Sequence, residues 1–254
     1  EACIVSASYQ SFGSQTVVEL WLRAREGHST LLLVHGLRPF LEIAPIGKTA
    51  DLPNDIEDRL EKARNVKDVT LIHPSVDKWT DLGIKPHWKV EVRQPYNVPK
   101  IRDALKSEGW EVSSADIKFS QRLLLDLDIG PHITWKGELL PQDGDAIRGA
   151  GGRGLYPTDQ VARCHIDDLR AIEAFAAPLV TFSFDLETSI ESGRILCAAA
   201  VVEQNGKSET HTFRGDEREM LEGLTRLVRD SDPDIITGYN IDNFDLPRIK
   251  ERME

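Results

Sequence analysis

Three acidic side chains of this sequence stand where they could bind metal ions. Asp185 and Glu187 lie two residues apart at the end of a hydrophobic run, residues 179–184, that predicts a buried strand. Side chains alternate between the faces of a strand, so both carboxylates should point the same way. Asp245 follows a second apolar strand, residues 235–239, at the expected start of a helix. Three carboxylates converging at strand ends can hold one or two hard divalent cations, as in a nuclease-type site.

The first 130 residues predict a compact α+β domain. Its expected strands cover residues 3–5, 16–22, 30–34, 67–73 and 88–92, and its expected helices cover residues 54–64 and 97–109. β-rich runs separated by turn residues support the strands. Apolar residues at helical spacing support the helices, and Gly109 should end the second one.

Residues 131–177 have a different composition, which predicts a connecting segment. Proline and glycine are frequent there, above all in the run Gly149 to Gly154. A glycine-rich loop can cradle phosphate, but no Lys-Ser/Thr follows this run and no strand leads directly into it, so a flexible linker is favoured. A helix is expected from Asp167 to Phe175.

From residue 178 the expected order is three strands, a helix, a strand and a helix. The strands cover residues 179–187, 195–202, 211–213 and 235–239, the first helix covers residues 217–229, and the second begins around Leu246. The apolar stripe of the first helix indicates core packing. This order is the opening half of an α/β ribonuclease-H-like fold, which the sequence predicts to be incomplete at residue 254.

The composition places the chain among globular proteins that work in the cytoplasm. It has 254 residues, 40% hydrophobic and 29% charged, which is enough for a sizeable core and predicts two domains. No apolar run approaches the roughly 20 residues of a membrane span, and no secretory leader is visible. Cys3, Cys164 and Cys197 are too far apart for a metal motif, so ordinary reduced thiols are expected.

The net charge of −11 is unusual for a protein that grips nucleic acid. A protein that binds duplex phosphates alone usually carries a basic stripe, and none is evident here. If the chain serves a DNA enzyme, the basic DNA channel is therefore expected in sequence outside it.

Two strings resemble a known enzyme family. Asp185-Leu186-Glu187 after its strand, followed by Asp-Pro-Asp-Ile-Ile-Thr-Gly-Tyr-Asn-Ile-Asp-Asn-Phe-Asp (Asp232 to Asp245), resemble the first two exonuclease motifs of family B DNA polymerases. Weaker similarities run through the rest of the chain, in the order and spacing of archaeal members. They are Arg38-Pro39-Phe40, the segment Tyr96 to Arg102, and the segment Ala115 to Arg122.

The resemblance implies roles for five residues of the exonuclease motifs. Asp185, Glu187 and Asp245 would bind two divalent cations, Mg²⁺ or Mn²⁺, and Asn240 and Phe244 would hold the 3′ end of DNA. The third motif of the family and its polymerising carboxylates are absent. The chain is therefore expected to be the N-terminal fragment of a larger enzyme, with an incomplete two-metal site and little activity of its own.

The resemblance to archaeal members also implies a pocket that captures template uracil. Such a pocket needs a tight floor and backbone groups that read the base edge. The matching positions are Tyr9, Pro39, Phe40, Val98, Ile117, Phe119 and Arg122. Lys118 replaces the proline usual in the family, a departure at the expected pocket wall.

The implied partners are the primer 3′ end, the single-stranded template, the remainder of the polymerase and a sliding clamp, with no membrane and a place at the nucleoid. Two other functions stay open. One is a non-catalytic module that binds single-stranded DNA or deaminated bases. The other is a stand-alone ribonuclease-H-like nuclease, for which only Glu251 and Glu254 follow Asp245 as further acids. In the simplest interpretation, the acids are a solvated strand end and a helix N-cap.

Overall fold

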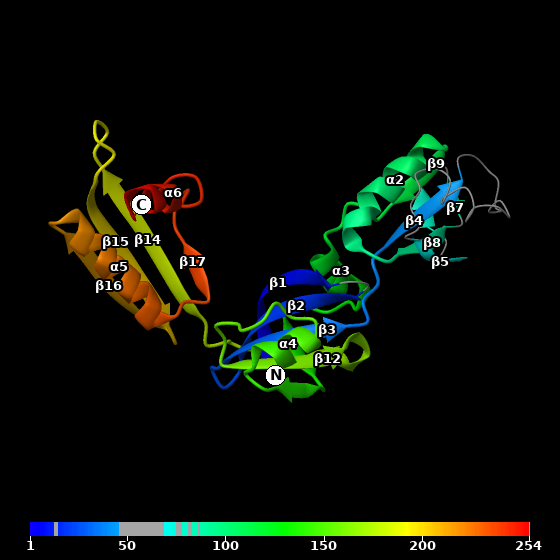
Figure 1. The fold of residues 1–254 in the computed structure, drawn as a ribbon, viewed down its shortest axis with the longest axis horizontal. Helices are drawn as coiled ribbons and strands as arrows, with labels where there is room; N and C mark the ends of the chain where they lie inside the picture. The colour runs from blue at the N-terminus through cyan, green and yellow to red at the C-terminus, as the bar shows by residue number, and fades with distance from the viewer. Residues whose placement is uncertain (13–14, 46–68, 75–77, 81–82, 86, 254) are drawn as a thin grey trace.

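The computed structural model describes residues 1–12, 15–45, 69–74, 78–80, 83–85 and 87–253. Three larger β-sheets with their helices lie in a row along the longest axis, and the sheet that contains β1 to β3 is in the middle (Figure 1). The expected helix over residues 54–64 falls outside the described residues. Within the described part, no helix has the length and hydrophobicity that a membrane crossing requires.

The central sheet has seven strands in the order β11-β12-β3-β2-β1-β10-β13. Its elements are β1 (Ala2–Phe12), β2 (Gln15–Ala24), β3 (Ser29–His35), β10 (His132–Trp135), β11 (Glu138–Leu140), β12 (Gln160–His165) and β13 (Leu169–Ala171), with α3 (Phe119–Asp126) and α4 (Gly144–Gly149). Strand β12 runs parallel to β3 and the other neighbours are antiparallel. The strands expected near the N-terminus are confirmed as β1 to β3.

Both faces of the central sheet are covered, because its middle strands carry apolar residues on each side. Leu32 of β3 packs in one core with Leu123 of α3. Its neighbour Leu33 points the other way and packs in a second core with Ile147 of α4. Successive side chains of a strand alternate faces, so a continuous apolar run such as that of β3 can serve two cores.

The segment over residues 131–177 differs from the flexible linker expected there. It supplies four strands of the central sheet and the helix α4. Glu19, whose side chain is fully buried on β2, accepts hydrogen bonds from Arg153 (2.7 Å and 3.2 Å), the Tyr156 hydroxyl (2.6 Å) and Ser8 (2.7 Å). A buried carboxylate needs such partners. The glycine-rich segment is therefore held by contacts to a residue far away in the sequence.

The helix expected from Asp167 to Phe175 is wrong. The chain forms a short 3-10 helix, η2 (Ile166–Asp168), and then strand β13, which pairs with β10. The backbone N–H of Ile172 donates to the carbonyl oxygen of His132 at 3.1 Å. The apolar spacing that suggested a helix instead reflects single contacts, such as the packing of Leu169 in the core and of the Phe175 ring against His132.

A second sheet lies between β3 and α3 in the sequence. Its strands, in the order β5-β8-β4-β9, are β4 (Phe40–Pro45), β5 (Val69–Pro74), β8 (Trp88–Val92) and β9 (Trp110–Ser113). The remaining elements of this region are β6 (Lys78–Thr80), β7 (Gly83–Lys85), the 3-10 helix η1 (Pro95–Asn97) and α2 (Val98–Ser107). Helix α2 buries Ile101 and Leu105 against Leu41 and Val90 of the sheet. The strand and helix expected around residues 88–109 are confirmed.

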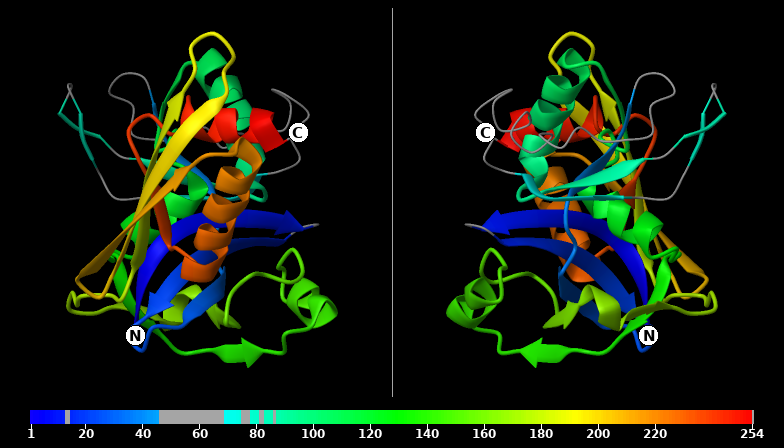
Figure 2. Two further views of the ribbon diagram at one scale, coloured as in Figure 1. Left: turned by 90° about the vertical axis from the view of Figure 1, so that its left-hand side faces the viewer. Right: turned by 90° about the vertical axis from the view of Figure 1, so that its right-hand side faces the viewer.

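The third sheet has the order β16-β15-β14-β17. Its elements are β14 (Val180–Thr188), β15 (Ile195–Gln204), β16 (Lys207–Arg214), α5 (Glu217–Ser231), β17 (Ile235–Thr237) and α6 (Asp245–Met253). Strands β14 to β16 form an antiparallel meander, and β17 runs parallel to β14. Helix α5 packs Met220 and Leu224 on one face of the sheet and runs alongside it in Figure 2. Every element expected from residue 178 onward is present.

A buried ion pair joins the central sheet to the third sheet. The Arg23 guanidinium on β2 donates to both carboxylate oxygens of Asp234 at 2.7–3.1 Å, and the two side chains are 10% and 7% exposed. Asp234 also accepts from the backbone N–H of Val180 at 2.9 Å, and Arg23 donates to the carbonyl oxygen of Gly27. Bidentate geometry with further hydrogen bonds is the arrangement that a buried pair needs.

Removing one partner of this pair should be costly. Arg23→Ala leaves Asp234 buried without its counter-charge, and we expect the free energy of unfolding to fall by about 3–5 kcal/mol. Arg163→Ala removes an exposed pair with Glu138 and should cost about 0–1 kcal/mol. Urea unfolding of both variants measures the difference. Equal costs for the two would show that the buried pair does not hold the sheets together.

Candidate active site

Strand β14 carries a core on one face and acids on the other. Phe182, Phe184 and Leu186 are buried against α5. Asp185 and Glu187 alternate with them and are exposed on the opposite face. The hydrophobic alternation that builds the core therefore also directs both carboxylates to one open face of the sheet.

The segment from Gly238 to Asp245 lies against the end of β14. A Cβ at Gly238 would lie 2.5 Å from the carbonyl oxygen of Phe184, so only glycine permits this approach. Ile241 is 8% exposed and packs in the core under α5. Asn240 has a φ of 57°, and its side-chain oxygen accepts a hydrogen bond from the side-chain amide of Asn243 at 3.0 Å. These two features fix a tight turn. The turn delivers the chain directly to α6.

Asp245 is the first residue of α6 and is only 2% exposed. Its Oδ1 accepts a hydrogen bond from the backbone N–H of Leu186 at 3.2 Å, between the two acids of β14. Burial raises the pKa of this carboxyl, and the nearby charge of Asp185 raises it further. The structure thus places the Asp245 carboxylate beside the backbone of Leu186, the residue next to Asp185, although Asp245 is far from both in the sequence.

The donor chemistry of the three acids suits a hard divalent cation, which prefers carboxylate oxygens. A buried carboxylate beside a second negative charge is also a site that a cation would relieve. Among the described residues, however, no three histidine, cysteine, aspartate or glutamate side chains come close enough together to hold one ion. The fit is therefore partial: Asp245 is hydrogen-bonded to the residue between Asp185 and Glu187, and these two acids share one face of β14.

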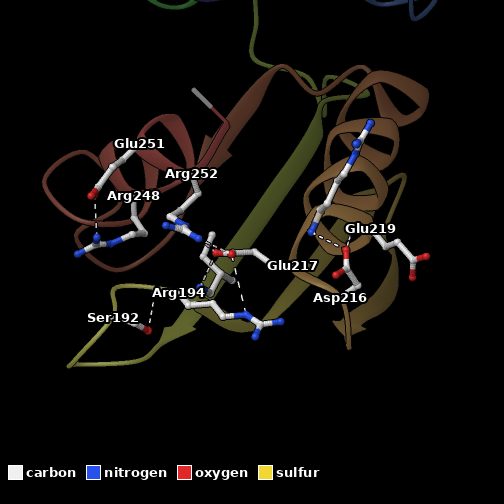
Figure 3. Close-up of polar contacts among 10 residues, drawn as sticks. Ser192, Arg194, Asp216, Glu217, Glu219, Arg248, Glu251 and Arg252 are labelled. Atoms are coloured by element: carbon white, nitrogen blue, oxygen red, sulfur yellow. Dashed lines mark hydrogen bonds and ion pairs between the residues drawn. The ribbon is translucent and has the colours of Figure 1, made fainter.

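Helix α6 is held in place by Glu217 at the start of α5 (Figure 3). The Glu217 carboxylate accepts from Arg252 of α6 at 2.6 Å and 2.8 Å, and from the backbone N–H of Ile195 at 2.8 Å. The Arg252 hydrogen bond lowers the pKa of Glu217 to about 2, against the opposing effect of burial. The sequence alone does not indicate this ion pair, because Glu217 and Arg252 have the pattern of ordinary charged residues on helix surfaces.

Four of the residues expected to form a uracil pocket make two separate ring contacts. The Arg122 guanidinium stacks on Phe40 at 3.7 Å, and Lys89 Nζ lies 4.0 Å from the same ring. Tyr9 meets Phe119 edge to face, with 5.4 Å between ring centroids. Burial lowers the pKa of Arg122.

The expected pocket residues are divided between two hydrophobic cores. Phe119 belongs to the core of the central sheet, whereas Val98 belongs to the core under α2. Pro39 lines a cavity of about 550 Å³ whose other walls come from β2, β3 and the residues around Thr70 and Arg93. Of the seven expected residues, Pro39 is the one that lines this cavity.

Comparison with known proteins finds similar sequences in one family. Residues 202–254 match the family model described as DNA polymerase family B, exonuclease domain. A DNA polymerase of Archaeoglobus fulgidus is 26% identical over 100% of this chain and 30% of its own length. The DNA polymerase delta catalytic subunit of Arabidopsis thaliana is 25% identical over 95% of this chain and 26% of its own length. The chain thus spans less than a third of the length of these relatives.

The fold has a solved counterpart. The structure of the family B DNA polymerase from the hyperthermophilic archaeon Pyrobaculum calidifontis superposes with a TM-score of 0.71 and 23% identity, covering 99% of this chain and 32% of that one. The likeness shows a shared α+β fold over the whole chain. Together with the sequence matches, it shows that the chain is similar to the N-terminal part of family B DNA polymerases, and that residues 202–254 are similar to their exonuclease domain.

Proposed function

We propose that this chain serves DNA replication as the N-terminal and exonuclease part of a DNA polymerase with 3′–5′ proofreading activity. The observation that carries the proposal is the hydrogen bond from Leu186 to Asp245, which holds the Asp245 carboxylate at the residue between Asp185 and Glu187, because Asp245 lies in the segment that matches an exonuclease domain. The relatives bear the name DNA polymerase, and the activity of a longer protein around this chain follows by analogy. A sliding clamp and a place at the nucleoid are further predictions of the same analogy.

Asp185, Glu187 and Asp245 would hold divalent cations, Mg²⁺ or Mn²⁺. Such ions polarise a scissile phosphate and supply hydroxide at neutral pH. The residues of the chain have their own tasks. The backbone N–H of Leu186 holds the Asp245 carboxylate in place, and α6 stays seated through Glu217. The sheet order, with a parallel β17 beside β14, supports a ribonuclease-H-like unit over residues 178–254.

Phe244 and Asn240 are the proposed contacts to the 3′ end of DNA. Phe244 is 40% exposed next to Asp245, so its ring can stack on an unpaired base. Asn240 shapes the turn that carries Phe244. Tyr239, which is 92% exposed on the same turn, offers a second ring.

Alone, this chain should digest DNA hardly at all. No group of three suitable ligands converges among the described residues, and ligands of a metal site act as a unit. We expect the rate on 3′-labelled single-stranded DNA with Mg²⁺ or Mn²⁺ to lie within about twofold of an Asp185→Ala control. Metal-dependent digestion well above that control would mean that the site is complete, and would favour a stand-alone nuclease instead.

The raised pKa of Asp245 predicts a conflict between stability and cation binding. A carboxyl whose pKa is raised on folding stabilises the folded protein at a pH below its ordinary pKa of 3.8. This stabilisation is lost as the pH rises through the raised pKa that the group has in the folded protein. At pH 7 the ionised group is therefore destabilising. Asp245→Asn keeps an oxygen that can accept from Leu186, so we expect a higher Tm at pH 7, a smaller gain at pH 4, and Mn²⁺ affinity at least tenfold weaker.

Asp245→Ala is the matched control. It removes the same charge but leaves the Leu186 N–H without its acceptor, which should cost about 1–3 kcal/mol. Thermal unfolding and Mn²⁺ titration by electron paramagnetic resonance measure both effects. If Asp245→Asn proved as unstable as Asp245→Ala, the buried charge would not be the source of strain.

Uracil recognition is a second candidate function, favoured by the half-exposed Tyr9 ring, which packs edge to face on Phe119. Tyr9 is 37% exposed, so its ring is available to stack on a base, as a non-catalytic reader of template DNA requires. We expect tighter binding of a uracil-containing oligonucleotide than of its thymine counterpart, with the preference lost in Tyr9→Ala. Tyr96→Ala removes a ring that is 59% exposed elsewhere and should keep the preference. Equal affinity of the wild type for the two oligonucleotides would exclude this function.

A further inference from the structure

An in-register row of side chains crosses the third sheet from the candidate site. Glu187 of β14 pairs with Cys197 of β15, and Cys197 pairs with Arg214 of β16. Directly paired residues of neighbouring antiparallel strands point to the same face. With a strand spacing of about 4.8 Å, two steps place the Arg214 backbone roughly 10 Å from that of Glu187. The candidate carboxylates and one guanidinium therefore share a face.

The burial of the neighbouring residues supports this assignment of faces. Phe213 packs in the core under α5, and its ring meets Gly223 of that helix. Thr212 and Arg214 flank Phe213 and are exposed. The row next to Arg214 joins Asp185, Ala199 and Thr212, so a hydroxyl stands beside the guanidinium on the same open face.

Arg214 differs from most arginines of this region in having no carboxylate partner. Arg194 and Arg252 contact Glu217, and Arg248 contacts Glu251. For Arg214, the described residues provide neither an ion pair nor a hydrogen bond to its side chain. An unpaired, exposed guanidinium is free to bind an anion.

We propose that Arg214 binds a phosphate of the single DNA strand whose 3′ end lies at Asp185 and Glu187. The proposal rests on the proposed exonuclease function. Guanidinium and threonine hydroxyl groups are common donors to phosphate oxygens. An acidic peptide fits this face less well, because bare carboxylates would repel it, whereas a cation held by Asp185 and Glu187 would attract DNA phosphates.

The test is binding of a fluorescent oligothymidylate to the 254-residue chain at low salt with Mn²⁺ or Ca²⁺. We expect Arg214→Ala to weaken binding about 5–10-fold and to lower the salt slope by about one. Arg214→Lys should keep the slope. The matched control is Arg226→Ala, which removes an exposed arginine from α5, on the opposite face, and should change affinity less than twofold.

The reactivity of the Cys197 thiol gives an independent measure of DNA binding to the face that carries Arg214. Cys197 is the partly exposed thiol of the chain, since Cys3 and Cys164 are buried. Bound oligothymidylate should slow its reaction with a thiol reagent in the wild type, and less so in Arg214→Ala at the same concentration. Equal losses in Arg214→Ala and Arg226→Ala, no protection of Cys197, or no binding by the wild type would each overturn the proposal.

The outcome for Arg214 is separable from that of the exonuclease function. If Asp245→Asn leaves Mn²⁺ affinity unchanged while Arg214→Ala still weakens DNA binding, the face binds DNA without the proposed metal site. If Asp245→Asn weakens Mn²⁺ binding but Arg214→Ala leaves DNA affinity unchanged, the proposed metal site is supported and the proposed path of the DNA strand is wrong.

Discussion

The buried ion pair between Arg23 and Asp234 joins the central sheet to the third sheet, and the chain itself crosses from one to the other after β13. Asp234 precedes β17 directly and also receives the N–H of Val180, the first residue of β14. One carboxylate thus sets the starting points of two neighbouring strands and ties both to β2. Since β14 and β17 are parallel, no hairpin can set their register. The contacts of Asp234 at the start of both strands set it instead.

The candidate site follows from this alignment. Strand β14 presents Asp185 and Glu187 at a defined distance from its start, and β17 leads through the turn at Gly238 to Asp245. The hydrogen bond from the Leu186 N–H to Asp245 then joins the last part of β14 to the start of α6. The acids are therefore positioned by backbone contacts and by the core under α5, which keeps a buried charge close to a second one. Such juxtaposed charges are typical of functional sites rather than of stable cores.

The sequence predicted most of the fold where the pattern is local. Strands β1 to β3 and β14 to β16 have apolar alternation or β-rich runs, and α5 has a single apolar stripe. Residues 131–177 were misjudged because glycine content indicates local freedom, whereas Glu19 restrains this segment from a distant strand. The pairing of Arg23 with Asp234 and the row that ends at Arg214 depend in the same way on register between remote strands. No local pattern contains that information.

The topology of the central sheet bears on how the chain is made. Strand β3 needs β12 as its parallel neighbour, and β1 needs β10, yet about 100 residues separate the two halves of the sheet. At the ribosome's pace of roughly 5–20 residues per second, β1 to β3 wait several seconds for these partners. During that time Leu31 and Leu33 have no cover from α4. The inserted region with α2 is synthesised during that time, so the nascent chain passes through a stage in which the sheet edge at β3 is open.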